Sequence, residues 1–142
     1  REYDYDNGTD CLTILLPSGR KLYYISPGIG QNEWGRPSIS YMGMDQKTKR
    51  WKRIETYGGK LVENCVQAIA RDCLAASIDR LEAAKLPVVF HVHDEVVIDV
   101  APFADEDTML STVCSIMGEP VPWAPDLPLK AAGWVGYYFT KD

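Results

Sequence analysis

The 142-residue sequence is poor in histidine and cysteine: it has two histidines and four cysteines, and no two cysteines stand in a Cys-x-x-Cys pair. That spacing is the usual mark of structural zinc sites and of thiol–disulfide motifs. Cys65 and Cys73 lie within an apolar helical pattern. We therefore expect free thiols, with these two buried, rather than disulfides or a cysteine-bound zinc ion.

The sequence also lacks a long apolar run and an excess of positive charge. No run approaches the roughly 20 apolar residues of a membrane-spanning helix, and the opening residues Arg-Glu-Tyr-Asp do not resemble a signal peptide. We expect a cytoplasmic protein with no membrane partner. The formal net charge of −5 argues against attraction of the whole surface to nucleic acid, but it leaves room for a local basic patch.

What is present is an ordinary globular composition, 46% hydrophobic and 25% charged, in a length typical of one domain. In the first part of the chain, strand-forming runs separated by turn residues predict two hairpins. The glycine- and proline-rich residues 26–37 are predicted to form a loop between them. The first hairpin joins residues 11–16 to 20–25 through Pro17-Ser18-Gly19, and the second joins 39–42 to 51–56.

Further along, apolar side chains at spacings of three and four predict a long amphipathic helix over Gly59–Ala84. Pro87 ends this pattern, because proline cannot continue a helix and restricts the residue before it. A shorter helix is predicted over Asp105–Met117, where acidic residues occupy the first turn. After a proline-rich linker, Leu129–Phe139 is predicted to form a final strand.

The order of elements indicates the fold class. Nothing alternates as parallel βαβ units would, so the expected fold is α+β. We expect an antiparallel sheet of β-hairpins, with the long amphipathic helix and the shorter helix packed on it. We divide the chain into a hairpin-rich N-terminal segment, 1–57, and a C-terminal segment, 58–142, that contains both helices.

Residues 88–100 place an acidic pair, Asp94-Glu95, between two apolar runs. Runs rich in Val and Ile favour strands, and a gap of two residues favours a hairpin with both carboxylates at its tip. Val88, Phe90 and Val92 would form a wholly apolar face that holds the tip rigidly. Carboxylates displayed in this way suit a hard divalent cation and phosphate chemistry. An ordinary acidic turn that faces solvent is the alternative.

A second alternative uses the histidines beside that pair. His91 and His93 would share one strand face, and two neutral imidazoles there could begin the zinc site of a metallohydrolase. Such a site needs further ligands, and the chain has no other histidine. Only carboxylates or thiols could complete the shell.

Two polar patterns are candidates for contact with nucleic acid. The long helix carries a polar ridge at spacings of four, three and four, made of Lys60, Asn64, Gln67 and Arg71. Cations and amides suit contacts to the sugar–phosphate backbone and to minor-groove acceptors, whereas a solvated helix face is the alternative. A basic cluster interleaved with Trp51 predicts phosphate contacts, with a solvated basic turn as the alternative. It comprises Lys47, Lys49, Arg50, Lys52 and Arg53.

At this point the motifs carry a resemblance. The chain resembles the C-terminal palm of family A DNA polymerases, the group of bacterial DNA polymerase I and many phage replicases. The resemblance lies in the order of elements: a helix, a proline, a strand, Val92-His93-Asp94-Glu95 and a second strand. Val-His-Asp-Glu on a hairpin is that family's third polymerase motif. The segment Gly58–Asp72, which includes Gln67–Asp72, is similar to the helix before that motif, particularly in phage-like members. Leu127–Lys130 with Gly133–Gly136 resembles the last palm strand. The likeness covers roughly residues 39–142.

The resemblance implies template-directed nucleotidyl transfer from a dNTP to a primer 3′-hydroxyl on primer-template DNA, with Mg²⁺ as cofactor. It implies that Asp94 is the metal-associated catalytic carboxylate, that Glu95 is the second acid of the motif, and that His93 supports the primer terminus. Gln67 matches a helix glutamine that faces the minor groove of the nascent duplex. Asn64 stands three residues before it, whereas many family members have an asparagine four residues before, where this chain has Glu63.

The family's first acidic motif and its Lys- and Tyr-bearing fingers helix are not found, and both would precede Arg1. Two Mg²⁺ ions need carboxylates from two separate strands, so the chain alone is expected to be inactive and to need the missing N-terminal polymerase portion as a partner. The alternative is a non-catalytic nucleic-acid-binding domain or prophage remnant. Apolar surface left exposed in such a fragment would favour self-association.

Overall fold

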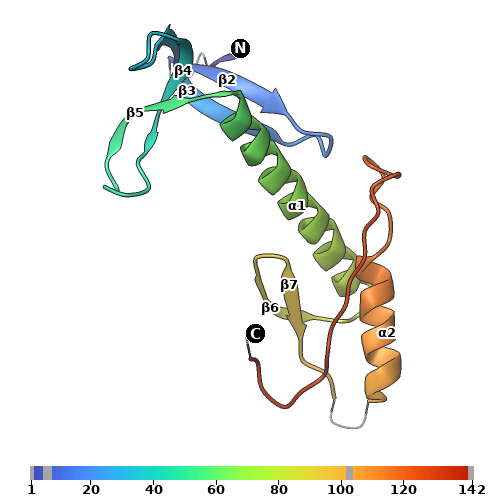
Figure 1. Cartoon of the computed structure of the whole chain (residues 1–142). Helices are drawn as coiled ribbons and strands as arrows, with labels where there is room; N and C mark the ends of the chain where they lie inside the picture. The colour runs from blue at the N-terminus through green and yellow to red at the C-terminus, as the bar shows by residue number, and fades with distance from the viewer. Residues whose placement is uncertain (1, 5–7, 102–103, 141–142) are drawn as a thin grey trace. The chain divides into compact units, whose positions relative to one another are not determined.

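The computed structural model describes residues 2–4, 8–101 and 104–140, and Figure 1 gives the order of the helices and strands. The chain forms two compact units, Arg1–Ala68 and Ile69–Asp142, and the boundary between them lies inside the long helix.

The first unit is built on a five-stranded antiparallel sheet in which each strand pairs with the next along the chain. Its strands are β1 (Glu2–Asp4), β2 (Thr9–Leu15), β3 (Lys21–Gln31), β4 (Pro37–Met44) and β5 (Trp51–Thr56). Both predicted hairpins are confirmed, as β2–β3 and β4–β5. The tight turn between β2 and β3 includes Gly19, whose φ of 88° is one that glycine adopts readily.

The prediction of a loop over residues 26–37 is wrong. Strand β3 continues to Gln31 and pairs with β4, so that Gly28 lies opposite Ser40 and Ile29 opposite Ile39. A shift of register between Ile25 and Gly28 explains how the strand passes through Pro27, which has no backbone N–H for a ladder hydrogen bond.

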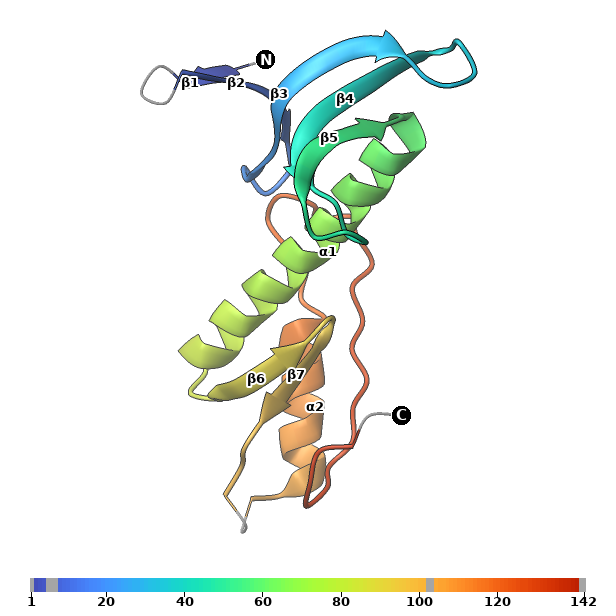
Figure 2. The same ribbon diagram turned by 90° about the vertical axis from the view of Figure 1, so that its left-hand side faces the viewer.

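One face of this sheet packs on the first half of α1 (Gly58–Ala83), as the curved strands β3–β5 show in Figure 2. Tyr24 is buried on this face, and its hydroxyl accepts a hydrogen bond from Asn64 Nδ2 at 3.1 Å. The Tyr24 ring also meets Tyr41 edge to face, with centroids 5.0 Å apart. A second hydrogen bond links the strands to α1: the Arg20 guanidinium, just before β3, donates to the Ala68 carbonyl oxygen at 3.0 Å.

The predicted long helix is confirmed within one residue at each end, and its C-terminus is a Schellman motif. Lys85 adopts a left-handed φ of 64°. Its N–H donates to the Glu82 carbonyl oxygen at 3.0 Å, and the Leu86 N–H donates to the Leu81 carbonyl oxygen at 2.9 Å. Leu81 and Leu86 are both buried, which is the apolar contact that accompanies this motif. Pro87 follows directly, as the sequence pattern indicated.

The second unit contains the rest of α1, a two-stranded hairpin and α2 (Glu106–Met117), which begins after Asp105 as predicted. Leu81 and Val121 are its fully buried large side chains among the described residues. The Arg80 guanidinium fixes the loop that carries Val121, because it donates to the carbonyl oxygens of Glu119 at 2.8 Å and Pro120 at 2.7 Å.

The predicted final strand, Leu129–Phe139, is wrong, since no strand is formed over these described residues. The segment makes side-chain contacts without a backbone ladder. A Cβ placed on Gly133 would lie 3.0 Å from Leu110 Cδ1 on α2, so the chain approaches that helix closely. Phe139 packs edge to face on Phe90, with centroids 5.2 Å apart.

The α+β class is confirmed: the chain has an antiparallel sheet, a separate hairpin, a long helix and a shorter one. The four cysteines are free, as predicted, but only Cys73 is fully buried and Cys65 is half-buried. Within the described part of the chain, no helix is both long and apolar enough to cross a membrane.

Candidate active site and nucleic-acid surfaces

The candidate catalytic residues lie on the hairpin of β6 (Val88–Val92) and β7 (Glu95–Ile98). Its two-residue turn consists of His93 and Asp94, and Glu95 is already the first residue of β7, opposite Val92. The expectation that the acidic pair itself forms the tip is therefore corrected by one residue. Asp94 is therefore a turn residue, whereas Glu95 belongs to the β7 strand.

The turn closes in this register because His93 adopts a left-handed φ of 51°. Such a conformation is uncommon outside glycine, although histidine is one of the side chains enriched there. Strained backbone of this kind clusters at functional sites, where the surrounding structure holds it in place. His93 and Asp94 are both exposed, so both side chains are accessible to a ligand.

The strands beneath the turn are less well buried than the sequence predicted. A bulge at Val89 shifts the register between Val88 and Phe90, so the simple alternation of faces does not continue through β6. Of the expected apolar face, Phe90 is exposed and Val88 and Val92 are only half-buried, so this face is not buried against a core. The base of the hairpin is held instead from α1, where Glu82 Oε1 accepts a hydrogen bond from the Val88 N–H at 2.7 Å.

The described residues contain no group of three His, Cys, Asp or Glu side chains placed to hold a metal ion. Asp94 thus offers one carboxylate from the turn, and Glu95 is its chain neighbour at the start of β7. The zinc alternative meets the same difficulty, because His93 lies in the turn and His91 is paired in the strand with Val96. His91 Nδ1 is instead 3.4 Å from Arg71 Nη1. Since guanidinium can only donate, this ring nitrogen is the acceptor in that contact.

Three residues of the predicted helix ridge have partners within the chain. Lys60 forms an ion pair with Glu63 at 2.9 Å, and hydrogen bonding to that carboxylate raises the pKa of Lys60. Asn64 binds Tyr24 and is half-buried, and Arg71 contacts His91. Gln67 is exposed on α1. Of the ridge, Gln67 is therefore the side chain best placed to meet a ligand without giving up an internal contact.

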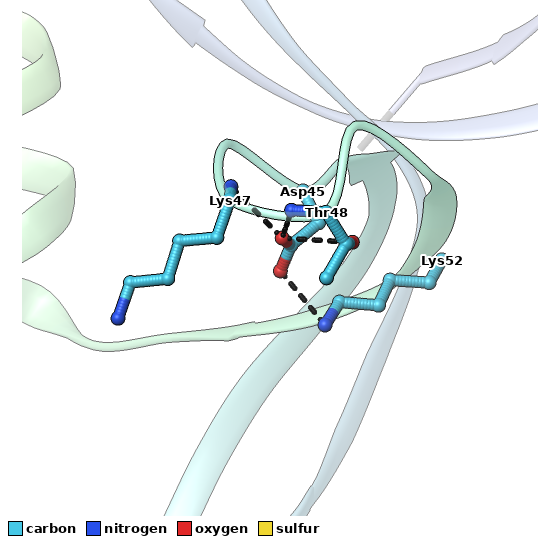
Figure 3. A network of polar contacts seen from close by, with 4 residues as sticks. All are labelled: Asp45, Lys47, Thr48 and Lys52. Atoms are coloured by element: carbon cyan, nitrogen blue, oxygen red, sulfur yellow. Dashed lines mark hydrogen bonds and ion pairs between the residues drawn. The ribbon is translucent and has the colours of Figure 1, made fainter.

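The basic cluster surrounds the turn between β4 and β5, and a single carboxylate organises it (Figure 3). Asp45 Oδ1 accepts hydrogen bonds from the backbone N–H groups of Lys47 and Thr48, at 3.0 and 2.7 Å, and from the Thr48 hydroxyl. Its other oxygen pairs with Lys52 Nζ at 2.7 Å. Hydrogen bonds from Lys52 and Thr48 lower the pKa of Asp45 well below its usual value.

The other cations of this cluster differ in how they are held. Arg53 Nη1 donates to the Ser26 carbonyl oxygen at 3.1 Å and lies 3.2 Å from Ser40 Oγ, both neutral groups. Lys49 and Arg50 are exposed and form no ion pair with a described residue. The turn therefore presents fixed backbone with several cations at its surface.

Sequence reasoning missed Asp45 as the centre of this turn. The signal was available, because Asp followed by Thr three residues later is a side-chain-to-backbone turn pattern.

The chain is similar to part of a phage DNA polymerase. It is 48% identical over 139 residues to the protein named DNA polymerase of Bacillus phage SP02. The match covers 97% of this chain and 20% of that polymerase, so the chain spans about a fifth of its relative's length. No protein-family model matches the chain, and no solved structure matches it significantly.

Proposed function

We propose that this chain is the C-terminal palm segment of a family A, phage-type DNA polymerase, and that it presents Asp94 to the primer terminus. The observation that carries the proposal is the 48% identity to a phage DNA polymerase along nearly the whole chain. The exposed His93-Asp94 turn supports it, because a strained, accessible turn held from a long helix is a suitable platform for one catalytic carboxylate.

The proposed roles follow the motif. Asp94 would be the carboxylate that faces the catalytic metal ions, and His93 would contact the primer end. Glu95, on the first position of β7, would support the site from the adjacent strand face. Gln67 would meet the minor groove of the new duplex, and Lys60, Asn64 and Arg71 would contact the DNA from the same ridge of α1. Such an enzyme would act in the cytoplasm.

Mg²⁺ prefers oxygen ligands, so Asp94 has the right chemistry for the ion. The described residues nevertheless supply only one side of a two-metal site, because Asp94 and Glu95 are consecutive and no third carboxylate joins them. The remaining ligands would come from the rest of the polymerase. We therefore expect the chain alone not to extend a primer.

A segment exchange tests the proposal. The 139 aligned residues of this chain replace the matching fifth of the phage SP02 polymerase, and primer extension is measured with Mg²⁺. The proposal predicts template-dependent extension by the exchanged enzyme and none by this chain alone. An exchanged enzyme that folds, binds primer-template and does not extend it would favour the non-catalytic, remnant alternative. Extension by the chain alone would show that it holds a complete metal site.

A further inference from the structure

The sheet of the first unit has a second face, opposite the one that packs on α1. Antiparallel partners share a face, so Tyr23 and Thr13 lie together, as do Met44 and Trp51. Ile25 on β3 pairs with Met42 on β4. Because these strands are antiparallel, Tyr23, two residues before Ile25, lies opposite Met44, two residues after Met42. One row therefore crosses four strands, in the order Thr13, Tyr23, Met44 and Trp51. We name this side of the sheet the open face.

Aromatic and apolar side chains stand out from this face. Tyr23 is 61% exposed, Trp51 55%, Met44 49% and Leu15, which points to the same side, 67%. Strands are about 4.8 Å apart, so the Tyr23 and Trp51 backbones are separated by about 10 Å, with Met44 between them. Apolar surface of this extent on one sheet face marks a binding surface more often than chance exposure.

Cations border the same row. Arg53 is two residues from Trp51 on β5, and its guanidinium reaches the Ser26 carbonyl oxygen on β3. Its Nη1 lies close to the backbone of Gly28, where an added Cβ would be 3.3 Å away. Lys49 and Arg50 immediately precede Trp51. The sole acid from residue 45 to residue 53, Asp45, is already paired with Lys52.

We propose that the open face binds single-stranded DNA, with bases stacked on Tyr23 and Trp51 and phosphates held by Lys49, Arg50 and Arg53. Flat aromatic rings on a sheet, bordered by cations, are the combination that holds unpaired strands without reading their sequence. Local positive charge complements a polyanion even though the chain carries a net charge of −5. This site lies in the first unit, whereas the candidate catalytic turn lies in the second, so the inference stands apart from the proposed polymerase role.

The test uses the intact chain and a fluorescein-labelled oligothymidylate, with binding followed by fluorescence anisotropy at low salt. Tyr23→Ala and Trp51→Leu should each weaken binding about tenfold, as expected for the loss of one stacked base. Tyr23→Phe keeps the ring and should retain binding. The matched control is Trp34→Leu, because Trp34 is 74% exposed but lies in the turn between β3 and β4, away from the row.

Two further measurements test whether the bound partner is single-stranded DNA: the salt dependence of binding and competition by duplex DNA. Replacing Lys49 and Arg50 by Gln should reduce the slope of log K against log salt by about 1.4, since each phosphate contact on a single strand contributes about 0.7. Duplex DNA of the same length should compete poorly, because its bases cannot stack on protein rings.

Equal loss in Trp34→Leu, equal competition by duplex, or no binding at all would overturn the proposal. Dimerisation that Trp51→Leu abolishes, without any DNA binding, would assign the face to a second copy of the chain. If the unmodified chain does not bind oligothymidylate while the exchanged polymerase extends primers normally, this inference alone is refuted.

Discussion

His93 combines an unfavourable backbone conformation with a proposed catalytic side chain, and glycine substitution separates the two. A left-handed φ such as its 51° costs a side-chain-bearing residue about 1–2 kcal/mol. Glycine removes that cost but loses about 0.5–1 kcal/mol of additional backbone entropy on folding. The difference spans about 0–1.5 kcal/mol, so His93→Gly should stabilise the folded hairpin by about 0.7 kcal/mol at the middle of that range. For a unit of this size, a gain of about 0.7 kcal/mol raises the Tm by about 3–6 °C.

The assay is thermal unfolding of the intact chain followed by circular dichroism. His91→Gly is the matched control, since His91 is paired with Val96 in β6 and has no positive φ to relieve. That control should lower the Tm by a few degrees, because glycine weakens a strand interior. If His93→Gly lowers the Tm as much as the control does, the turn is not strained and the reasoning fails. In the exchanged polymerase, His93→Gly should reduce primer extension despite its greater stability.

Two other predictions concern buried packing and the basic turn. Leu81→Ala should lower the free energy of unfolding by about 3–4 kcal/mol in urea titrations, because Leu81 is fully buried, whereas the exposed Leu127→Ala should cost under about 1 kcal/mol. A loss at Leu81 no larger than at Leu127 would contradict the assigned core. Asp45→Asn should destabilise the turn at neutral pH. Because the folded-state pKa of Asp45 is lowered, the stability difference between variant and wild type should persist above about pH 4. That difference should shrink as the pH falls below about 4. A Tm difference that grows on acidification would contradict the Lys52 and Thr48 contacts.

The sequence predicted the elements whose signal is local. The long helix was found because apolar spacing and Pro87 both mark it, and the β2–β3 hairpin because Pro17-Ser18-Gly19 can form only a turn. Strand β3 was cut short in the prediction because Pro27 and its neighbouring glycines look like a loop. The bulge that carries the strand through them depends on pairing with β4, which no local pattern reveals.

In the candidate site too, features with a local signal were predicted and features that depend on tertiary contacts were not. The hairpin at 88–98 was predicted correctly, but its turn lies one residue earlier, since the left-handed φ of His93 and the bulge at Val89 set the register. The prediction of the final strand failed because Leu129–Phe139 has a strand-like composition, but its contacts with Leu110 and Phe90 are made by side chains and it joins no backbone ladder. The internal contacts of Asn64 and Arg71 likewise depend on the tertiary fold. The catalytic and DNA-binding roles stay predictions.

The most direct test of whether Asp94 serves catalysis is an Asp-to-Asn substitution in the phage polymerase that carries this chain as its exchanged segment. Asp94→Asn keeps the shape of the turn but removes its negative charge, while Asp99→Asn makes the same change just beyond the other end of β7. We predict that Asp94→Asn lowers the rate of primer extension at least a hundredfold with unchanged binding of primer-template, a loss of about 2.7 kcal/mol in transition-state stabilisation, and that Asp99→Asn extends primers normally. Equal extension rates in the two variants would contradict the proposed function.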